Sequence, residues 1–327
     1  MRVYITRTLP EAGIEILKEA GIEIAQYSET KELDKDEFIK TCQDFDALLI
    51  AGHVRLDEYF FSKCPHLKAV SLLSVGYDNV DINAATKYKI PVGHTPDVLS
   101  GATADTAFLL MLAASRKAFY MYDYIKQDKW HFYQPTANLG IELNNKTLGI
   151  FGMGRIGMEM AKKAKGAYNM SIIYHNRKQN NEAEQLLNAR YVSFEELLEQ
   201  SDVLSAHANL SEETKGIFNK EAFAKMKPSS IFINTARGAL HNETDLTEAI
   251  QKGIIWGAGL DVTNPEPMSK DNILLTMPTV CVLPHQGSAT IETRAAMAKL
   301  SAENIVAIAN GKEMPHTVNK DVYAIQK

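Results

Sequence analysis

The sequence contains only three cysteines, and their positions disfavour several kinds of site. Cys42, Cys64 and Cys281 are widely separated, odd in number and without the short spacing of metal ligands. A disulfide-rich secreted domain and a cysteine-based zinc site are therefore not expected. This cysteine usage fits a reducing compartment, and we expect a cytoplasmic protein.

Long apolar runs and an excess of one charge are also missing. The longest apolar stretch, residues 107–114, is much too short to cross a bilayer, so no membrane association is expected. Met1 leads directly into a strand-like run, and no signal peptide is expected there. Lysine and arginine number 35 against 40 acidic residues, which gives a formal charge of −5 with both signs interspersed. This balance argues against nucleic acid as a partner and leaves a small molecule as the expected ligand.

A glycine-rich turn in the middle of the chain is the most informative local pattern. A short apolar strand, residues 147–151, is followed by Gly152, Gly154 and Gly157, and then by apolar residues at helical spacing. Strand, G-x-G-x-x-G turn and helix in this order are typical of a dinucleotide-binding unit. The glycines permit the turn, the approach of a pyrophosphate and close helix–strand packing, and the helix N-terminus offers N–H groups to the phosphates.

Strand-like and helical segments alternate along the chain. Strands are expected at 3–6, 22–25, 47–50, 67–73 and 91–93, and then at 148–151, 171–174, 203–206, 231–234, 258–262 and 280–283. Ser100 is expected to cap a long helix over about 101–116, Ser193 and Glu196 form a capping box, and a last helix is expected over about 291–309.

This alternation predicts an α/β protein of two doubly wound parallel-sheet domains. We expect a Rossmann-type cofactor domain of six strands over residues 100–290. It would be inserted into a discontinuous, flavodoxin-like substrate domain formed by residues 1–99 and 291–327.

The end of the second strand of the cofactor domain indicates which nicotinamide cofactor is preferred. An NAD-binding unit carries an acidic residue there for the ribose hydroxyls, whereas this chain has Asn176, Arg177 and Lys178. A guanidinium at this position can hold a 2′-phosphate in a bidentate manner. A solvated basic turn is the simpler alternative. The pattern favours NADP(H), with NAD(H) as a second cofactor.

Three later strands are each followed by a residue suited to hydride-transfer chemistry. Arg237, Glu266 and His285 each follow the carboxyl end of an expected strand. Arginine can pair with the carboxylate of a 2-oxo acid, and histidine can donate a proton to the carbonyl oxygen. A neighbouring glutamate stabilises the protonated imidazole. Each residue alone is more often structural, but the three together beside a dinucleotide turn favour catalysis.

Other histidines and a metal site receive less support. No third ligand accompanies Glu266 and His285, so no metal is expected. His207 ends a strand near the expected adenine side, and His53 and His94 lie in N-terminal loops. We expect the remaining histidines to be structural or at the surface.

Several motifs together resemble the D-isomer-specific 2-hydroxyacid dehydrogenases, and within them the glyoxylate/hydroxypyruvate reductases. These motifs are S-V-G-Y-D-N-V-D, H-T-P-D-V-L, G-M-G-R-I-G, I-N-T-A-R-G, G-L-D-V-T-N-P-E-P and L-P-H-Q-G-S-A-T. They occur in the family order over nearly the whole chain. The resemblance implies a reductase that transfers hydride from NADPH to a small 2-oxo acid, glyoxylate or hydroxypyruvate, and gives the D-isomer where the product is chiral.

The resemblance also implies roles for individual residues. His285 resembles the family acid/base, Glu266 its partner and Arg237 the residue that binds the substrate carboxylate. Further substrate contacts are expected from Val75, Gly76 and Ser288. Cofactor contacts are expected from Thr103, Gly152, Gly154, Arg155, Ile156, Gly157, Asn176, Arg177, Lys178, Asn209, Thr235, Ala236, Asp261 and Gly287.

The family's usual state is a homodimer formed through the nucleotide domains, so a homodimer is expected here. Two departures bear on the substrate. Family reductases tend to carry a tryptophan just after the proline of the loop before the glycine turn, whereas here Thr136 follows Pro135. Gln286 also replaces an aliphatic residue beside the histidine. Both departures concern the substrate pocket and leave the reaction type unchanged.

Two alternatives stay open. The first is another enzyme of the fold, an NAD-linked phosphoglycerate, D-lactate or formate dehydrogenase, against which the basic turn at Arg177 argues. The second is a non-catalytic protein that senses NAD(P)H and regulates a partner. Turnover of a 2-oxo acid distinguishes the sensor from the enzymes.

Overall fold

The computed structural model describes the whole chain except residues 32, 53, 326 and 327. Its contacts divide the chain into two compact units. Unit 1 comprises Met1–Leu99 and Ala289–Lys327, and unit 2 comprises Ser100–Ser288. Within the described residues, no helix is both long and apolar enough to cross a membrane.

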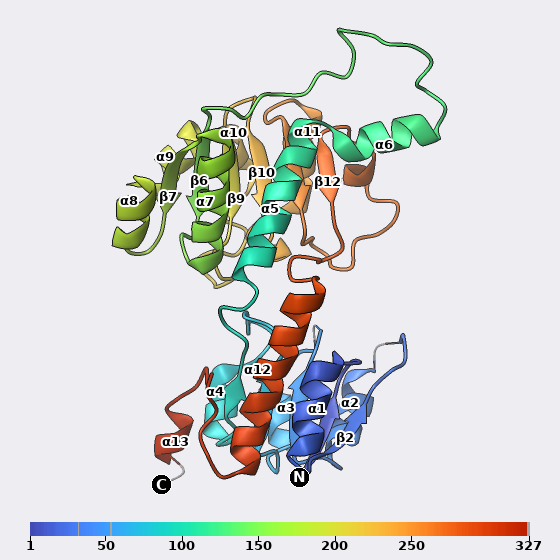
Figure 1. The fold of residues 1–327 in the computed structure, drawn as a ribbon, viewed down its shortest axis with the longest axis vertical. Helices are drawn as coiled ribbons and strands as arrows, with labels where there is room; N and C mark the ends of the chain where they lie inside the picture. Colours follow the sequence, from blue (N-terminus) through green and yellow to red (C-terminus); the bar gives the residue numbers. More distant parts are fainter. Residues whose placement is uncertain (32, 53, 326–327) are drawn as a thin grey trace. The chain divides into compact units, whose positions relative to one another are not determined.

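Unit 2 is built on a seven-stranded parallel sheet (Figure 1). Its strands are β6 (Thr147–Phe151), β7 (Ser171–His175), β8 (Arg190–Tyr191), β9 (Val203–Ala206), β10 (Ile231–Asn234), β11 (Gly257–Leu260) and β12 (Val280–Val282). Their order is β12-β11-β10-β9-β6-β7-β8. Six strands were predicted, and β8 was missed because two residues carry almost no periodicity. The order reverses between β6 and β9, and ligands of such sheets bind outside the carboxyl ends at this switch.

Helices cover both faces of this sheet. They are α5 (Ser100–Ser115), α6 (Ala118–Lys126), α7 (Arg155–Tyr168), α8 (Asn181–Leu187), α9 (Phe194–Gln200), α10 (Lys220–Ala224) and α11 (Glu243–Gln251), with short 3-10 turns η1 (Gly238–Leu240) and η2 (Ile273–Thr276). Side chains of α5 and α7 belong to one buried cluster, and those of α9, α10 and α11 to a second. The predicted Ser193–Glu196 capping box is confirmed. Ser100 was predicted to cap α5 but is its first helical residue.

Unit 1 contains a five-stranded parallel sheet in the order β2-β1-β3-β4-β5. Its strands are β1 (Arg2–Ile5), β2 (Glu23–Gln26), β3 (Ala47–Ile50), β4 (Ala69–Leu72) and β5 (Val92–Gly93). Its helices are α1 (Glu11–Glu19), α2 (Lys35–Cys42), α3 (Glu58–Lys63), α4 (Ile82–Lys87), α12 (Ile291–Ala309) and α13 (Val322–Ile325). The switch in strand order lies between β1 and β3. Both sheets are therefore doubly wound, as predicted.

Helix α12 packs beside α1 although most of the sequence separates them (Figure 1). Gly13 permits this approach, because a Cβ there would lie 2.7 Å from the Ala298 carbonyl oxygen. Apolar residues of both helices join the strands in one buried cluster. Helix α12 thus completes the core to which α1, near the start of the chain, also belongs.

Asn304 on α12 holds three segments of unit 1 together. It is fully buried, and its Nδ2 donates to the His94 carbonyl oxygen at 3.2 Å. Its Oδ1 accepts from the His316 backbone N–H at 3.1 Å. Nδ2 also lies 3.4 Å from the Ser71 hydroxyl oxygen on β4. One side chain therefore connects β4, the end of β5 and the C-terminal segment.

Replacing Asn304 by alanine is expected to lower the free energy of unfolding by about 2–4 kcal/mol, because the part-buried His316 N–H and His94 carbonyl lose their partner. Urea denaturation followed by circular dichroism measures this. Glu303→Ala is the matched control on the exposed side of the same helix, and it should change stability by less than about 0.5 kcal/mol. Equal effects of the two substitutions would contradict the role given to Asn304.

Candidate active site

The glycine turn follows β6 at the switch in strand order, and its three glycines meet three different requirements. Gly152 has φ +98, and a Cβ there would lie 2.5 Å from the Ala208 backbone nitrogen. At Gly154 a Cβ would meet nothing within 4 Å, so this side of the backbone is open. At Gly157 a Cβ would lie 2.6 Å from the Gly152 carbonyl oxygen, where α7 packs against the turn. The turn is thus tight, open at its middle glycine and closely packed at its third.

The polar turn after β7 supports the glycine turn. The Asn176 Oδ1 accepts from the Met153 backbone N–H at 2.6 Å, and Asn180 Nδ2 donates to the Met153 carbonyl oxygen at 2.9 Å. Arg177 and Lys178 are exposed. The side chain of Asn176 therefore holds the glycine turn, and the two basic side chains stand in solvent at the strand end.

The loop that carries Arg237 is held by a buried amide. Asn234, at the end of β10, is fully buried. Its Oδ1 accepts from the Ala236 N–H at 3.0 Å, and its Nδ2 donates to the Arg237 carbonyl oxygen at 2.9 Å. The same Nδ2 lies 3.0 Å from His241 Nδ1, which must therefore be the acceptor. Burial lowers the pKa of His241 to about 4, so the ring is neutral and accepts this bond near neutral pH. The hydrogen bonds of Asn234 thus hold the backbone at Arg237 in place.

The loop that carries Glu266 is held by α11. The Glu243 carboxylate accepts from the Asn264 backbone N–H at 3.0 Å and from Asn272 Nδ2 at 2.6 Å. Gly238 allows the Arg237 loop to approach this second loop, because a Cβ at Gly238 would lie 1.8 Å from the Thr263 carbonyl oxygen. The two loops are therefore in backbone contact, and only glycine fits between them.

The turn that carries His285 is built on Asp261. This carboxylate is 1% exposed, and its oxygens accept from the Gln286 N–H at 2.6 Å and the Gly287 N–H at 2.7 Å. Burial raises the pKa of Asp261, and the two backbone hydrogen bonds act in the opposite direction. His285 itself has a left-handed backbone with φ 55, which is uncommon for a residue with a Cβ. Its N–H donates to the Asp261 carbonyl oxygen at 2.8 Å.

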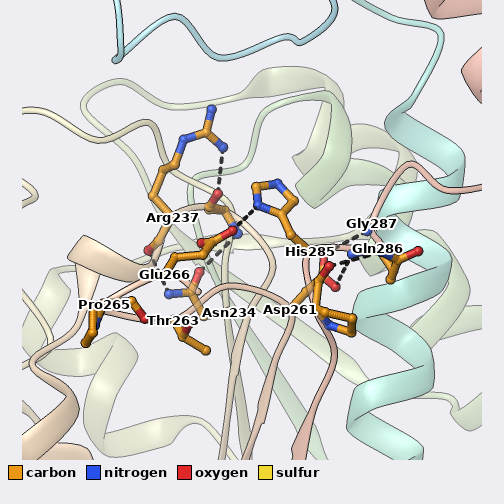
Figure 2. A network of polar contacts seen from close by, with 11 residues as sticks. Asn234, Arg237, Asp261, Thr263, Pro265, Glu266, His285, Gln286 and Gly287 are labelled. Atoms are coloured by element: carbon orange, nitrogen blue, oxygen red, sulfur yellow. Dashed lines mark hydrogen bonds and ion pairs between the residues drawn. The ribbon is translucent and has the colours of Figure 1, made fainter. Parts of the chain in front are cut away.

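The three predicted catalytic side chains meet at this edge of the sheet (Figure 2). His285 Nδ1 lies 2.6 Å from Glu266 Oε1, and both side chains are about one-third or less exposed, at 34% and 27%. The half-buried Arg237 donates from Nη1 to the Ala236 carbonyl oxygen at 2.7 Å. Figure 2 shows Glu266 directed at the His285 ring, with Arg237 on the neighbouring loop. A cation, a carboxylate and an imidazole thus leave the ends of β10, β11 and β12, which are adjacent strands.

The other predicted contacts of unit 2 differ in their exposure. Thr103 on α5 is buried beside Gly287, where a Cβ would lie 3.3 Å from its methyl group. Ser288 is half-buried and Asn209 is exposed. The buried Thr235 hydroxyl has no hydrogen-bond partner among the described residues.

The predicted substrate loop after β4 lies in unit 1. Val75 and Gly76 are half-buried, and the Ser74 hydroxyl donates to the Gly76 carbonyl oxygen at 2.7 Å. His94 Nδ1 donates to the Val75 carbonyl oxygen at 3.0 Å, and burial lowers the pKa of His94. Hydrogen bonds from the Ser74 and His94 side chains therefore hold this loop in place.

Two further histidines named from the sequence have different outcomes. His207 Nε2 bonds the Ser205 hydroxyl at 2.8 Å, and desolvation lowers the pKa of His207 to about 4. His53 lies outside the described residues. Across the described part of the chain, no group of three or more histidine, cysteine or acidic side chains could hold a metal ion.

Sequence reasoning named the strand-end residues but missed the side chains that hold them. Asn234 was named only as the end of an expected strand and as part of the motif I-N-T-A-R-G, and Glu243 was not singled out. An asparagine at the last position of a buried strand is unusual, because buried amides need several partners. That feature was the available signal for Asn234. Glu243 carried no comparable signal, since acidic residues are common in the first turn of helices.

The residues of unit 2 fit a dinucleotide. The backbone is open at Gly154, which is also the N-cap of α7 and supplies no side-chain cap to its first turn. The Thr235 hydroxyl is buried without a partner among the described residues, at the carboxyl end of β10. An open glycine, an uncapped helix N-terminus and an unpaired buried hydroxyl at one sheet edge are what a bound dinucleotide requires.

Comparison with known proteins agrees with this arrangement. Residues 108–287 match the NAD binding domain of the D-isomer specific 2-hydroxyacid dehydrogenases. The chain is 40% identical over 330 residues to a glyoxylate reductase of Pyrococcus furiosus, a match that covers 100% of this chain and 97% of the relative. A solved structure of a Thermus thermophilus protein has a TM-score of 0.90 and 39% identity, and the match covers 97% of this chain and 100% of that one.

A third similar protein is an NADPH-dependent glyoxylate/hydroxypyruvate reductase from Sinorhizobium meliloti, solved in complex with NADP and malonate. It has a TM-score of 0.82 and 30% identity, and the match covers 97% of this chain and 96% of that one. Family match, relatives and sheet topology agree over nearly the whole length of the chain. The chain belongs to the D-isomer specific 2-hydroxyacid dehydrogenase family, whose central domain binds a nicotinamide cofactor.

Proposed function

We propose that the protein reduces glyoxylate or hydroxypyruvate to the 2-hydroxy acid with NADPH. The observation that carries this proposal is the 2.6 Å contact between His285 and Glu266, at strand ends next to the loop of Arg237. The Pyrococcus and Sinorhizobium relatives support the substrate class by their names. Acting on a small 2-oxo acid requires one cation for the carboxylate and one proton donor for the carbonyl oxygen, and this edge offers both.

In this proposal Arg237 binds the substrate carboxylate. A guanidinium matches a carboxylate in shape and charge, and it draws electron density from the adjacent carbonyl. The Asn234 amide fixes the backbone from which Arg237 extends. Orientation of the substrate therefore depends on a rigid loop.

His285 is the proposed proton donor. Its Nδ1 faces Glu266, so the proton given to the carbonyl oxygen leaves from Nε2. Glu266 favours the protonated imidazole and fixes the orientation of the ring. The bound cofactor supplies the hydride. Residues of the chain thus supply the charge stabilisation and the proton.

The NADP(H) preference rests on the turn after β7. Arg177 and Lys178 are exposed at the end of the strand, and no carboxylate accompanies them in the Asn176–Lys178 turn. A 2′-phosphate there would gain charge-assisted hydrogen bonds. The complex of the Sinorhizobium reductase with NADP supports the same preference.

We also propose a homodimer formed through unit 2. Seven of the large apolar side chains that are exposed belong to residues 109–139 of the chain: Leu109, Tyr122, Ile125, Trp130, Phe132, Tyr133 and Leu139. In Figure 1 the chain after α6 runs away from the rest of its unit. Apolar surface of this extent is typical of an interface. A cytoplasmic location belongs to the same proposal, and the three free, buried cysteines fit it.

Replacing His285 by alanine is expected to lower kcat for NADPH oxidation with glyoxylate by about 10²–10⁴-fold, because general acid catalysis is lost. Steady-state absorbance of NADPH follows the reaction, and quenching of protein fluorescence confirms that NADPH still binds. His66→Ala, at an exposed position of unit 1, is the matched control and should retain activity. Unchanged turnover in His285→Ala would remove the acid role. If the wild-type protein binds NADPH but reduces no 2-oxo acid, a sensor function replaces the proposed one.

Replacing Arg177 by alanine is expected to raise the KM for NADPH about tenfold or more and to leave the KM for NADH within about twofold, because only NADPH carries the 2′-phosphate. Initial rates with both cofactors provide the comparison. Lys162→Ala, an exposed lysine of α7 paired with Glu159, is the control for loss of a surface charge. A similar rise in KM for both cofactors would show that Arg177 does not recognise the 2′-phosphate.

Sedimentation equilibrium is expected to give the mass of two chains, and the double substitution Tyr122→Lys with Ile125→Lys should shift the species toward one chain. Two charges placed on an apolar interface face a large desolvation cost. Leu186→Lys, at an exposed apolar position of α8, should leave the mass unchanged. A wild-type protein with the mass of one chain contradicts the dimer.

A further inference from the structure

A cavity of about 270 Å³ lies within unit 1, at the carboxyl ends of its first strands. It is lined by residues of β1 and by the segments that follow β2 and β3, and by α2 and α3. The sheet order β2-β1-β3 places the switch point between β1 and β3. Doubly wound sheets bind ligands at this position. The predicted substrate loop at Val75–Gly76 follows β4, so the cavity is a different position on the same sheet edge.

Part of the cavity lining is apolar and aromatic. Phe38 of α2, Phe60 of α3 and the ring of Tyr4 on β1 all line it, and all three belong to one buried cluster. Phe38 and Phe60 stack with ring centroids 5.6 Å apart. Such a surface favours an apolar or aromatic body and disfavours a purely polar ligand.

The hydroxyl of Tyr4 has no hydrogen-bond partner among the described residues, although the residue is only 5% exposed. The residue lines the cavity, and its hydroxyl oxygen is itself accessible rather than buried. Burial raises the pKa of Tyr4, so the hydroxyl keeps its proton and can donate. A ligand atom in the cavity would supply the missing acceptor.

The lining of the cavity also carries positively charged side chains. Arg55 lines the cavity and forms no ion pair with the described residues. Its guanidinium has five N–H groups, so it can donate to a bound anion. Arg7 also lines the cavity, and its guanidinium lies 5.6 Å from the Tyr27 ring centroid while Nη1 donates to the Thr6 carbonyl oxygen. Arg7 is therefore held at the cavity wall by contacts of its own.

Lys35 differs from Arg55 because Lys35 already forms an ion pair. Its Nζ lies 2.7 Å from Asp57 Oδ2. The hydrogen bond from Lys35 is the largest cause of the lowered pKa of Asp57, and the attraction of Arg55 is a smaller one. Asp57 therefore neutralises mainly the positive charge of Lys35. The charge that remains suits one carboxylate better than a multiply charged phosphate.

We propose that this cavity binds a small monocarboxylic acid with an aromatic or branched apolar body. Its carboxylate accepts from the Tyr4 hydroxyl and from Arg55, and its body packs on Phe38 and Phe60. The volume accepts a body of about one ring and is too small for a nucleotide. Glyoxylate has no apolar body, so this ligand is not the proposed substrate. The inference is independent of the proposed reaction.

Isothermal titration of the full-length protein with phenylacetate tests the site without any turnover. We expect a Kd of about 0.1–1 mM, typical for a ligand of this size. Acetate, which lacks the ring, and 2-phenylethanol, which lacks the charge, should each bind about tenfold more weakly or worse. Equal binding of 2-phenylethanol would overturn the carboxylate assignment.

Two substitutions test whether phenylacetate binds in this cavity. Tyr4→Phe keeps the ring and the packing, and Arg55→Gln changes an exposed side chain, so both should fold and both should weaken phenylacetate binding about fivefold or more. Lys68→Gln, an exposed lysine paired with Asp46 elsewhere in unit 1, should leave the Kd unchanged. An unchanged Kd in both Tyr4→Phe and Arg55→Gln would overturn the proposal.

A further comparison separates this site from the catalytic one. Phenylacetate should bind His285→Ala with the wild-type Kd, and glyoxylate should not displace it. Displacement by glyoxylate would show that phenylacetate occupies the substrate site and would overturn the second site. Because binding is read directly, a protein without reductase activity would still give a result.

Discussion

Parallel pairing of β10, β11 and β12 is the constraint on which the candidate active site depends. The register pairs Asn234 with Leu260 and Leu260 with Val282, so the three strands end at one level. Each following loop then leaves the sheet on the same edge. Arg237, Glu266 and His285 therefore lie on three separate loops at the same edge. The sheet brings the three loops close together, and the loops carry the reactive side chains.

Buried polar side chains then hold these loops at the angles that the site requires. Asn234 uses both ends of its amide, and Asp261 uses both carboxylate oxygens, on backbone groups of the loops that follow. Leaving such partners unpaired in the interior costs about 1–3 kcal/mol each, so the loops are strongly restrained. The restraint is needed at His285, because a left-handed backbone at a residue with a Cβ costs about 1–3 kcal/mol. The two hydrogen bonds to Asp261 stabilise the turn in which this conformation occurs.

Local patterns in the sequence predicted most of the fold. Strands with continuous apolar runs and helices with capping residues were identified, and the helix predicted over about 291–309 has the bounds of α12. It was expected to be the last helix, but the short α13 follows it. The two-residue strand β8 was missed, and Ser100 was misplaced by one position because helix ends depend on packing as well as on capping chemistry. Strand-end residues could be named from order alone. Their supports could not, because a bond such as that between Asn234 and His241 depends on a tertiary contact that no periodicity encodes.

The two units use the same kind of sheet edge for different purposes, and side-chain chemistry accounts for the difference. At the ends of β10–β12 the charged groups pair with one another or with backbone, and the cluster is polar. At the ends of β1–β3 in unit 1, aromatic rings line a cavity, and the Tyr4 hydroxyl in the same lining has no hydrogen-bond partner among the described residues. A polar edge suits a small, highly charged molecule that is positioned by directional bonds. An aromatic cavity with an arginine at its lining suits a ligand held by its apolar body, and this contrast is why the second site is assigned to a different acid from the first.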